Sequence, residues 1–226
     1  MVDPRPPRAE LRRAAVPLDG TDPEPPVHPD AGAMLREMAE DATLIALGEA
    51  SHGARAQFRL KHRLIRHLVE ECGVRAFALE EDANWIRQVD QYVTGGERDI
   101  ERLLQHARIN WPWKTAELAA LLSWMRTFNE DRSARDQLRV YGFDISSFDR
   151  IAQSLLTFFD TVDDDISGMR GKLETLAEAN VEPPIDLAAS VQETLASLFD
   201  NHQHWEGQCS TEQVAFARRQ VTLLRQ

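Results

Sequence analysis

The chain has 226 residues, 42% of them hydrophobic, which is enough for one large domain, alone or with a subdomain, that buries its own core. It carries 26 Lys and Arg against 37 Asp and Glu, and the net charge of −11 disfavours a nucleic acid or an anionic membrane as partner, because phosphate repels such a surface. No apolar stretch has the length of a membrane span, the first residues lack the pattern of a secretory signal, and Cys72 and Cys209 have no CxxC partner, so the sequence predicts a cytoplasmic protein.

A strand–helix–strand pattern follows an irregular arm. Residues 1–30 hold eight of the eleven prolines and are expected to be irregular or partly ordered, with at most a short helix at 9–15. After a short amphipathic helix at 30–40, the apolar run Thr43–Leu47 has the length and composition of a buried strand. A strong helix at 54–71 and a second apolar run at 74–79 come next. The sequence therefore predicts two parallel strands joined by a right-handed crossover.

The rest of the chain is mostly helical in pattern. Apolar periodicity predicts helices at 82–93, 98–108 and 116–129, followed by a third strand at 138–143. Everything after Ser147 has a helical pattern, with breaks near 168–171 and 180–184. The helices expected there are 148–164, 171–179, 185–205 and 210–226.

These elements predict an α/β fold. We expect a mostly parallel sheet with flanking helices, and a helical subdomain that walls a cleft at the C-terminal ends of the strands. The expected divisions are an arm at 1–30, an α/β core at 31–147 and a helical subdomain at 148–226. The subdomain is expected to be incomplete at its C-terminus, because its last predicted helix has no stop signal.

The loop Gly48–Gly53 (GEASHG) carries the residues best suited to chemistry. It lies between a predicted strand and a predicted helix, at the strand end where open parallel sheets bind ligands. His52 has the side chain best matched to proton transfer near neutral pH, and Glu49 is close enough in sequence to orient it. Ser51 suggests a Ser–His nucleophile, but GEASHG is not the G-x-S-x-G elbow, so this alternative is weak.

Acidic residues directly follow the other two predicted strands. Glu80 and Glu81 come after the second strand, and Asp144 comes after the third. In a parallel sheet these carboxylates converge with His52 on one rim. Such a group perturbs pKa values for acid–base chemistry, and it also has the ligand types of a divalent-metal site, so both readings stay open at this point.

Other candidate residues give weaker signals. His62 and His67 are five residues apart, not four, and lack the HExxH pattern of a zinc protease. His202 and His204 point to different faces of a helix, which favours packing over metal binding. The loop Trp111–Trp113 either lines an apolar pocket or belongs to the core.

An ordered series of sequence blocks resembles the erythromycin esterase family. The series covers about residues 33–150 and comprises LGEASHG (47–53), FRLKHRLIRHLVEECGVRAFALE (58–80), YVTGG (92–96), WKTAEL (113–118), LLSWMRTFNE (121–130) and YGFD (141–144). The order and spacing of so many blocks make the resemblance specific. The helical tail beyond residue 150 fits the variable helical region of the family but is not diagnostic.

The resemblance implies an α/β core with a helical subdomain that forms one wall of a deep cleft. It also implies hydrolysis of an ester or of a macrocyclic lactone by water. In this comparison His52 is the general base that activates the water, and Glu49 is its supporting carboxylate. Glu80 matches a further functional glutamate of the family.

Four more residues are expected to contact the substrate. Lys61 falls where the family has a basic residue, and its charge would stabilise negative charge on the carbonyl oxygen. Asp144 matches the family pattern at the third strand and is expected to form the pocket. Trp111 and Trp113 are expected to contribute to substrate choice. The resemblance does not fix a cofactor, so we assign neither a cofactor nor metal ligands.

The chain departs from the family pattern at two places. Members commonly have Glu-Phe where this chain has Ala56-Gln57, which removes a carboxylate beside the base. Known members also continue beyond this length, to an apolar strand and a His-Asn-x-His segment that faces the same cleft. We therefore expect the chain to supply one half of the site and to be the N-terminal part of a longer enzyme.

The leading hypothesis is a cytoplasmic ester hydrolase that acts on a small-molecule ester or lactone, with neither a nucleic acid nor a membrane as partner. One alternative is a non-catalytic or binding homologue that keeps the fold without the second half of the site. Another is a metal-dependent hydrolase that uses Glu49, His52, Glu80 and Asp144. Substrate identity does not follow from the family, because fold and base do not specify an acyl group.

Overall fold

The chain folds into two compact units. The computed structural model describes residues 18–105, 111–144, 148–162, 166–179, 185–201 and 208–224, together with residues 10, 12, 15, 16 and 205. The first unit comprises residues 1–78 and 88–141, and the second comprises residues 79–87 and 142–226. The domain boundary at residue 147 that the sequence suggests stays a prediction.

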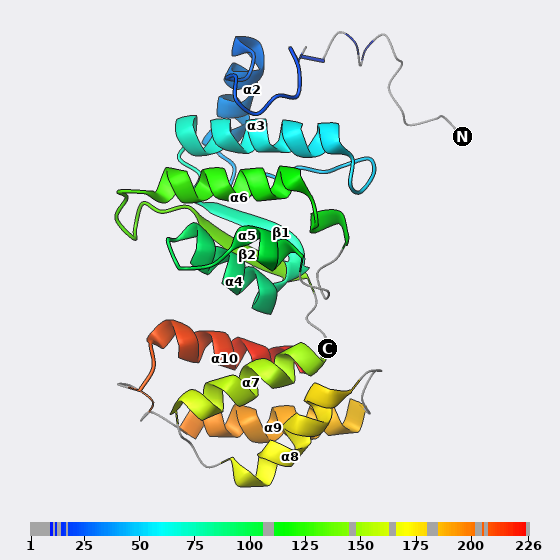
Figure 1. Ribbon diagram of the computed structural model, residues 1–226, viewed down its shortest axis with the longest axis vertical. Coiled ribbons are helices and arrows are strands. Elements are labelled where there is room, and N and C mark those ends of the chain that lie inside the picture. Colours follow the sequence, from blue (N-terminus) through cyan, green and yellow to red (C-terminus); the bar gives the residue numbers. More distant parts are fainter. Residues whose placement is uncertain are drawn as a thin grey trace, which may run out of the picture. The chain divides into compact units, whose positions relative to one another are not determined.

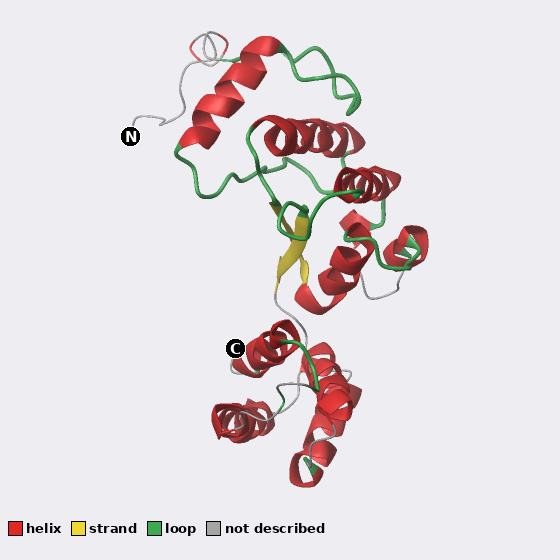
Figure 2. Cartoon of the chain, turned by 90° about the vertical axis from the view of Figure 1, so that its left-hand side faces the viewer, coloured by secondary structure: helices red, strands yellow, loops and turns green. Residues whose placement is uncertain are grey.

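Three amphipathic helices organise the first unit. They are α2 (Pro29–Glu40), α3 (Arg55–Glu71) and α6 (Ala116–Asn129), and they confirm the helices predicted at 30–40, 54–71 and 116–129. Helices α3 and α6 lie side by side (Figures 1 and 2). Their apolar stripes are buried, as 3.6-residue periodicity requires. The buried apolar residues are Phe58, Ile65, Leu68 and Val69 on α3 and Leu118, Leu121, Leu122 and Met125 on α6.

The sheet within the described residues has two parallel strands, β1 (Ala76–Asp82) and β2 (Arg139–Asp144). They correspond to the strands predicted at 74–79 and 138–143. The connection between them contains α4 (Ala83–Val93), α5 (Ile100–Leu104), the 3-10 turn η1 (Trp111–Trp113) and α6. A helix-bearing crossover of this kind is what parallel strands need. The predicted α/β class is thus correct. The prediction of a mostly parallel sheet overstated the strand content, because the described residues form only two strands in a helix-rich chain.

The strand predicted at Thr43–Leu47 is absent: this segment has no regular secondary structure. Ile45 packs against a small cluster built from Val27, Leu35 and Leu68, whereas the Leu44 side chain is 82% exposed. An apolar run predicts burial, but a strand forms only when a neighbouring strand satisfies its backbone groups. The apolar run therefore located the start of the Gly48–Gly53 loop correctly, but its composition did not predict its own secondary structure.

Two buried polar side chains fix the start of β2. Oδ1 of Asp90 accepts a hydrogen bond from the backbone N–H of Val140 (2.8 Å), and Oδ2 accepts one from Arg139 (2.6 Å). The side chain of Asn129 bonds both the backbone N–H (2.7 Å) and the carbonyl (2.9 Å) of Leu138. Because α4 carries Asp90 and α6 ends at Asn129, these bonds set the register of β2 against both helices.

Residues 18–28 of the N-terminal arm are irregular, as expected, and Arg63 of α3 holds them in place. The buried Arg63 guanidinium donates to the carbonyls of Gly20 (3.1 Å), Pro25 (2.9 Å) and Pro26, and it forms an ion pair with Asp19 (2.8 Å). A proline-rich segment has few N–H groups of its own to bond, so a multiple donor on the helix is a suitable anchor.

We expect Arg63→Met to destabilise the fold by about 1–2 kcal/mol, because the charge-assisted bonds are lost while the released carbonyls turn to water. Urea unfolding measures the change. Arg59→Met is the matched control: it removes the exposed pair between Arg59 and Asp22 (3.2 Å) from the same helix, and such pairs contribute about 0–1 kcal/mol. Equal effects of the two substitutions would contradict the anchoring role.

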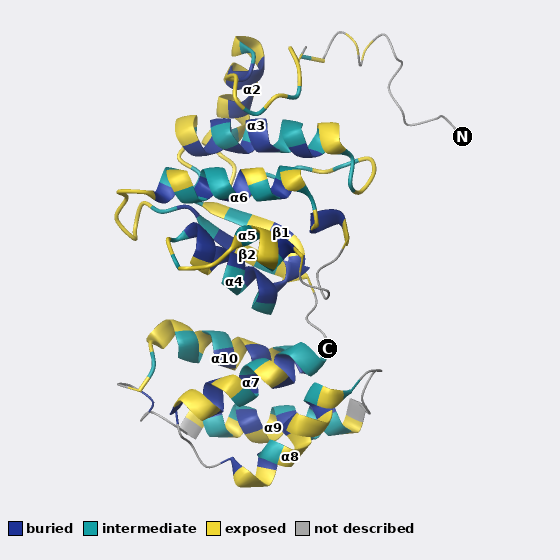
Figure 3. Cartoon of the chain, viewed as in Figure 1, coloured by how far each residue is buried: buried dark blue, intermediate teal, exposed yellow. Residues whose placement is uncertain are grey.

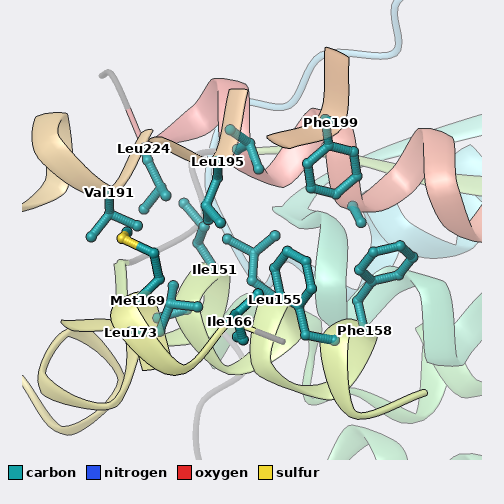
Figure 4. Close-up of a cluster of buried hydrophobic side chains, with 14 of the residues drawn as sticks. Ile151, Leu155, Phe158, Ile166, Met169, Leu173, Val191, Leu195, Phe199 and Leu224 are labelled. Carbon is teal, nitrogen blue, oxygen red and sulfur yellow. The ribbon is translucent and has the colours of Figure 1, made fainter. Parts of the chain in front are cut away.

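Four helices make up most of the second unit: α7 (Phe148–Val162), α8 (Ser167–Glu178), α9 (Ile185–Asn201) and α10 (Thr211–Leu223). Their inner faces form one apolar cluster (Figure 4). Phe158, Phe199 and Trp205 pack together in it, with ring centroids 4.8–5.6 Å apart. Aromatic pairs at this spacing add to the stabilisation from burial.

The helix break predicted near 168–171 lies earlier: α7 ends at Val162 and α8 begins at Ser167, so that Gly168 and Gly171 lie inside α8. Gly171, in the interior of the helix, costs about 1 kcal/mol. Burial of Met169, Leu173 and Leu176 on the same helix offsets this cost, which is a tertiary effect that local propensity omits. The break predicted at 180–184 and the His202–His204 pair lie outside the described residues.

Exposed residues alternate with buried ones along the helices (Figure 3). Among the described residues, the exposed large hydrophobic ones are Leu18, Met34, Met38, Leu44, Trp111, Tyr141 and Phe143. Along the part of the chain that the structure describes, no helix has both the length and the apolar character to cross a bilayer.

Candidate functional site

The GEASHG loop leads directly into α3. Its backbone turns at Gly53, whose φ of +71° lies in the region that glycine adopts without strain. Gln57, in the first turn of α3, accepts a hydrogen bond from the backbone N–H of Ala50 (3.3 Å). This hydrogen bond joins Ala50, before the turn, to Gln57, after it, and so stabilises the loop. The sequence marked Gln57 only as a departure from the family, and it gave no signal that this amide binds the loop.

Glu49 lies between His52 and Lys61. Its Oε1 is 2.5 Å from Nδ1 of His52, and its Oε2 accepts a hydrogen bond from Nζ of Lys61 (2.6 Å). The Glu49 side chain is only 11% exposed, whereas the His52 side chain is 59% exposed. The structure thus brings together three of the predicted site residues, with a partly buried carboxylate that orients an accessible imidazole.

The charge of Glu49 determines which histidine nitrogen is basic. Burial raises the pKa of the Glu49 carboxyl, but the hydrogen bonds from Lys61 and His52 outweigh burial and hold this pKa below its ordinary value. Glu49 is therefore ionised at neutral pH and only accepts hydrogen bonds. The hydrogen between the two side chains consequently resides on Nδ1, and neutral His52 presents the lone pair of Nε2.

Trp111 borders the same loop. Its ring meets the His52 ring edge to face, with centroids 6.4 Å apart, and it remains 67% exposed. Trp113, by contrast, is buried and packs edge-on against Phe58 (5.8 Å). The two tryptophans of the loop therefore have different surroundings: Trp111 lies beside the predicted base, and Trp113 belongs to the core. Their contacts with substrate stay predictions.

Gly53 lies directly under Trp111. A Cβ at this position would be 2.8 Å from Cζ3 of Trp111. We expect Gly53→Ala to cost about 1–2 kcal/mol in unfolding free energy, from positive-φ strain and displacement of the ring. Gly73→Ala is the control, because Gly73 has φ +73° with nothing within 4 Å of its Cβ position. A greater loss at Gly53 in urea unfolding supports the contact; equal losses contradict it.

Glu80 and Asp144 were expected to follow their strands directly, but both lie inside them: Glu80 is the fifth of the seven residues of β1, Asp144 is the last residue of β2, and both are exposed. They belong to the second unit, whereas Glu49, His52 and Lys61 belong to the first. The convergence of Glu49, His52, Glu80 and Asp144 on one rim stays a prediction.

The described residues contain no group of three or more His, Cys, Asp and Glu side chains that would hold a metal ion. Within the GEASHG loop, both oxygens of Glu49 already contact His52 and Lys61. Nε2 of the buried His67 hydrogen-bonds to the carbonyl of Gly32 (3.2 Å), so His67 has a structural partner outside this loop. The metal-dependent alternative thus gains no support from these side chains.

Comparisons with known proteins identify the family. A family model described as erythromycin esterase matches residues 69–226, more than half of the chain. The chain belongs to the erythromycin esterase family. The matched residues include Glu80 and Asp144, whereas the loop with Glu49 and His52 precedes them.

Individual proteins and solved structures are also similar to this member of the erythromycin esterase family. Erythromycin esterase type II of Escherichia coli is 30% identical over 118 residues, which is 49% of this chain and 25% of that protein. Among solved structures, a Bacillus cereus protein gives a TM-score of 0.73 at 23% identity over 96% of this chain and 54% of its own. A succinoglycan biosynthesis protein gives 0.73 at 22% identity with the same coverage. A variant of the erythromycin esterase EreC in its open conformation gives 0.56 at 17% identity, over 91% and 55%.

The solved structures share the fold of this erythromycin esterase family chain. The chain spans about half of the length of each of them, and its match to the Escherichia coli relative covers a quarter of that protein.

Proposed function

We propose that the chain hydrolyses carboxylic esters, lactones included, through attack of a water molecule that His52 activates. The observation that carries the proposal is the 2.5 Å contact between Nδ1 of His52 and Oε1 of Glu49, on a largely exposed ring. Membership in the erythromycin esterase family supports hydrolysis of a small molecule. The name of the Escherichia coli relative supports a macrocyclic lactone as one substrate class.

The proposed reaction has two proton transfers. Nε2 of His52 accepts a proton from water while the water oxygen bonds to the carbonyl carbon and the π electrons move to the carbonyl oxygen. Ionised Glu49 stabilises the imidazolium that forms. The imidazolium then donates its proton to the departing alkoxide as the C–O bond breaks, which releases the acid and the alcohol and restores neutral His52.

Lys61 acts in this scheme through Glu49. Its bond to Oε2 (2.6 Å) keeps the carboxylate ionised and directed at His52. An ammonium group has three donors, so a second one is available for the carbonyl oxygen as its charge grows. Glu80 is a further catalytic group of the proposal, and Asp144 and Trp111 are its expected substrate-contacting residues.

A covalent serine mechanism is the main rival for this loop. The Ser51 hydroxyl donates to the backbone carbonyl of His52 (3.5 Å), and the hydrogen bonds of the described residues include none between this hydroxyl and the imidazole ring. Water attack therefore fits better than a Ser–His pair. It predicts no acyl-enzyme.

A panel of small acyl esters and macrolactones tests the proposal, with proton release at constant pH as the measurement. We expect turnover by the wild type and by Ser51→Ala, with no acyl adduct in the intact mass of the protein. Absence of turnover across the panel would refute ester hydrolysis. An adduct at Ser51 that disappears in Ser51→Ala would refute the water mechanism alone.

A further inference from the structure

Two buried carboxylates turn the chain from β1 into α4. The side chains of Glu81 and Asp82 are only 2% and 4% exposed. Oε1 of Glu81 accepts the backbone N–H of Asp82 (2.9 Å), and Oδ1 of Asp82 accepts the backbone N–H of Trp85 (2.9 Å). The second bond caps the first turn of α4. Together they fix the backbone at the strand end where Glu80 lies.

Arg150, in the first turn of α7, approaches both carboxylates. Its Nη1 is 3.5 Å from Oδ1 of Asp82 and 4.0 Å from Oε1 of Glu81. Buried carboxylates are unfavourable unless a cation or hydrogen bonds compensate them. The guanidinium therefore holds the two acids in one arrangement, and it links the helical part of the second unit to the end of β1.

The neighbouring strand, β2, packs closely against the backbone of residues 81–83. A Cβ at Gly142 of β2 would be 2.6 Å from the carbonyl oxygen of Glu81 and 2.9 Å from Cα of Ala83. Backbone packed this closely leaves little freedom to move. Arg150 and the Gly142 backbone thus act on the same few residues.

We infer that Arg150 is a positioning residue, which fixes the direction of Glu80 through Glu81 and Asp82. Side chains alternate along a strand, so a backbone held by Glu81 on one face sets the direction of Glu80 on the other. The consequence for catalysis rests on the proposed function, in which Glu80 is a further catalytic group. Misplacement of a reacting group by about 1 Å can cost about 10²-fold in rate.

A double-mutant cycle between Arg150 and Glu80 tests the inference. We expect Arg150→Met to lower kcat by about 10²-fold with little change in KM. The loss is expected to be much smaller in a Glu80→Gln background, because the residue through which Arg150 acts is already gone. Arg150→Lys keeps the charge and is expected to recover most of the rate.

Hydrogen exchange provides a readout that does not depend on activity. The amides of Asp82 and Trp85 are expected to exchange faster in Arg150→Met than in the wild type. Arg218→Met is the control, since Arg218 of the same unit pairs with Asp200 (3.0 Å) and the carbonyl of Phe199 (2.7 Å); it should leave both amides and kcat unchanged.

Unchanged exchange at Asp82 and Trp85 in Arg150→Met would overturn the inference, and so would an equal loss of kcat in both Glu80 backgrounds. If the wild type hydrolyses no ester, the proposed function fails. The exchange measurement then decides by itself whether Arg150 holds the backbone at Glu81 and Asp82 in place.

Discussion

Replacement of His52 by alanine is expected to lower kcat for ester hydrolysis by about 10²–10⁴-fold, the usual contribution of a positioned general base. The reason is the ionised Glu49, which fixes the hydrogen on Nδ1 and leaves Nε2 as the proton acceptor. The ring is largely exposed, so its removal should leave the free energy of unfolding nearly unchanged. Initial rates and urea unfolding measure the two quantities on the same preparation.

The partners of His52 sharpen this prediction. Glu49→Gln keeps the shape of the side chain but loses the charge that stabilises the imidazolium, so we expect a smaller loss in kcat than in His52→Ala. His28→Ala is the control, because His28 is a partly exposed histidine that caps α2 and does not contact the GEASHG loop in the described hydrogen bonds. Full turnover by His52→Ala would rule out the general-base role.

The stability of the chain is expected to fall by about 2 kcal/mol between pH 7 and pH 5 because of His62. Burial, together with the nearby Arg66 charge, lowers the pKa of His62 to about 4, against only a small opposing effect of Glu24. The unfolded chain therefore binds a proton between about pH 6.5 and pH 4 that the folded chain does not. Stability must then rise with pH across this window and fall as the solution is acidified through it.

Substitution by phenylalanine separates this effect from other titrations. His62 is 5% exposed, its Nε2 is buried without a hydrogen-bond partner among the described residues, and its ring packs against Trp124 (5.8 Å). Phenylalanine keeps the ring contact and removes the proton-binding site. We expect His62→Phe to lose most of the pH dependence of the unfolding free energy between pH 7 and pH 5. An unchanged slope would exclude His62 as its source.

The contact between Glu49 and His52 was predictable from the sequence. Loop composition and close spacing made these two residues candidates, and their side chains do contact each other, although the strand expected before the loop is absent. Helical periodicity located α3, which carries Lys61. These predictions depend on residues within one short segment, where spacing alone limits the geometry.

Features that depend on distant neighbours were not predictable. The apolar run at Thr43–Leu47 has strand composition without a strand's pairing. The family resemblance suggested Lys61 as a partner of the carbonyl oxygen, and only the folded loop reveals its contact with Glu49. The approach of Arg150 to Asp82 spans almost seventy residues of sequence, and charge patterning contains no information on such a pair.

The arm that Arg63 anchors has a consequence for folding kinetics. Every bond between Arg63 and residues 19–26 closes a loop of 37 to 44 residues, and the donor is usable only after α3 has formed. The arm should therefore dock late, after the transition state of folding. Its contacts then retard unfolding without accelerating folding, so loss of the anchor shortens the lifetime of the native state while the refolding rate stays the same.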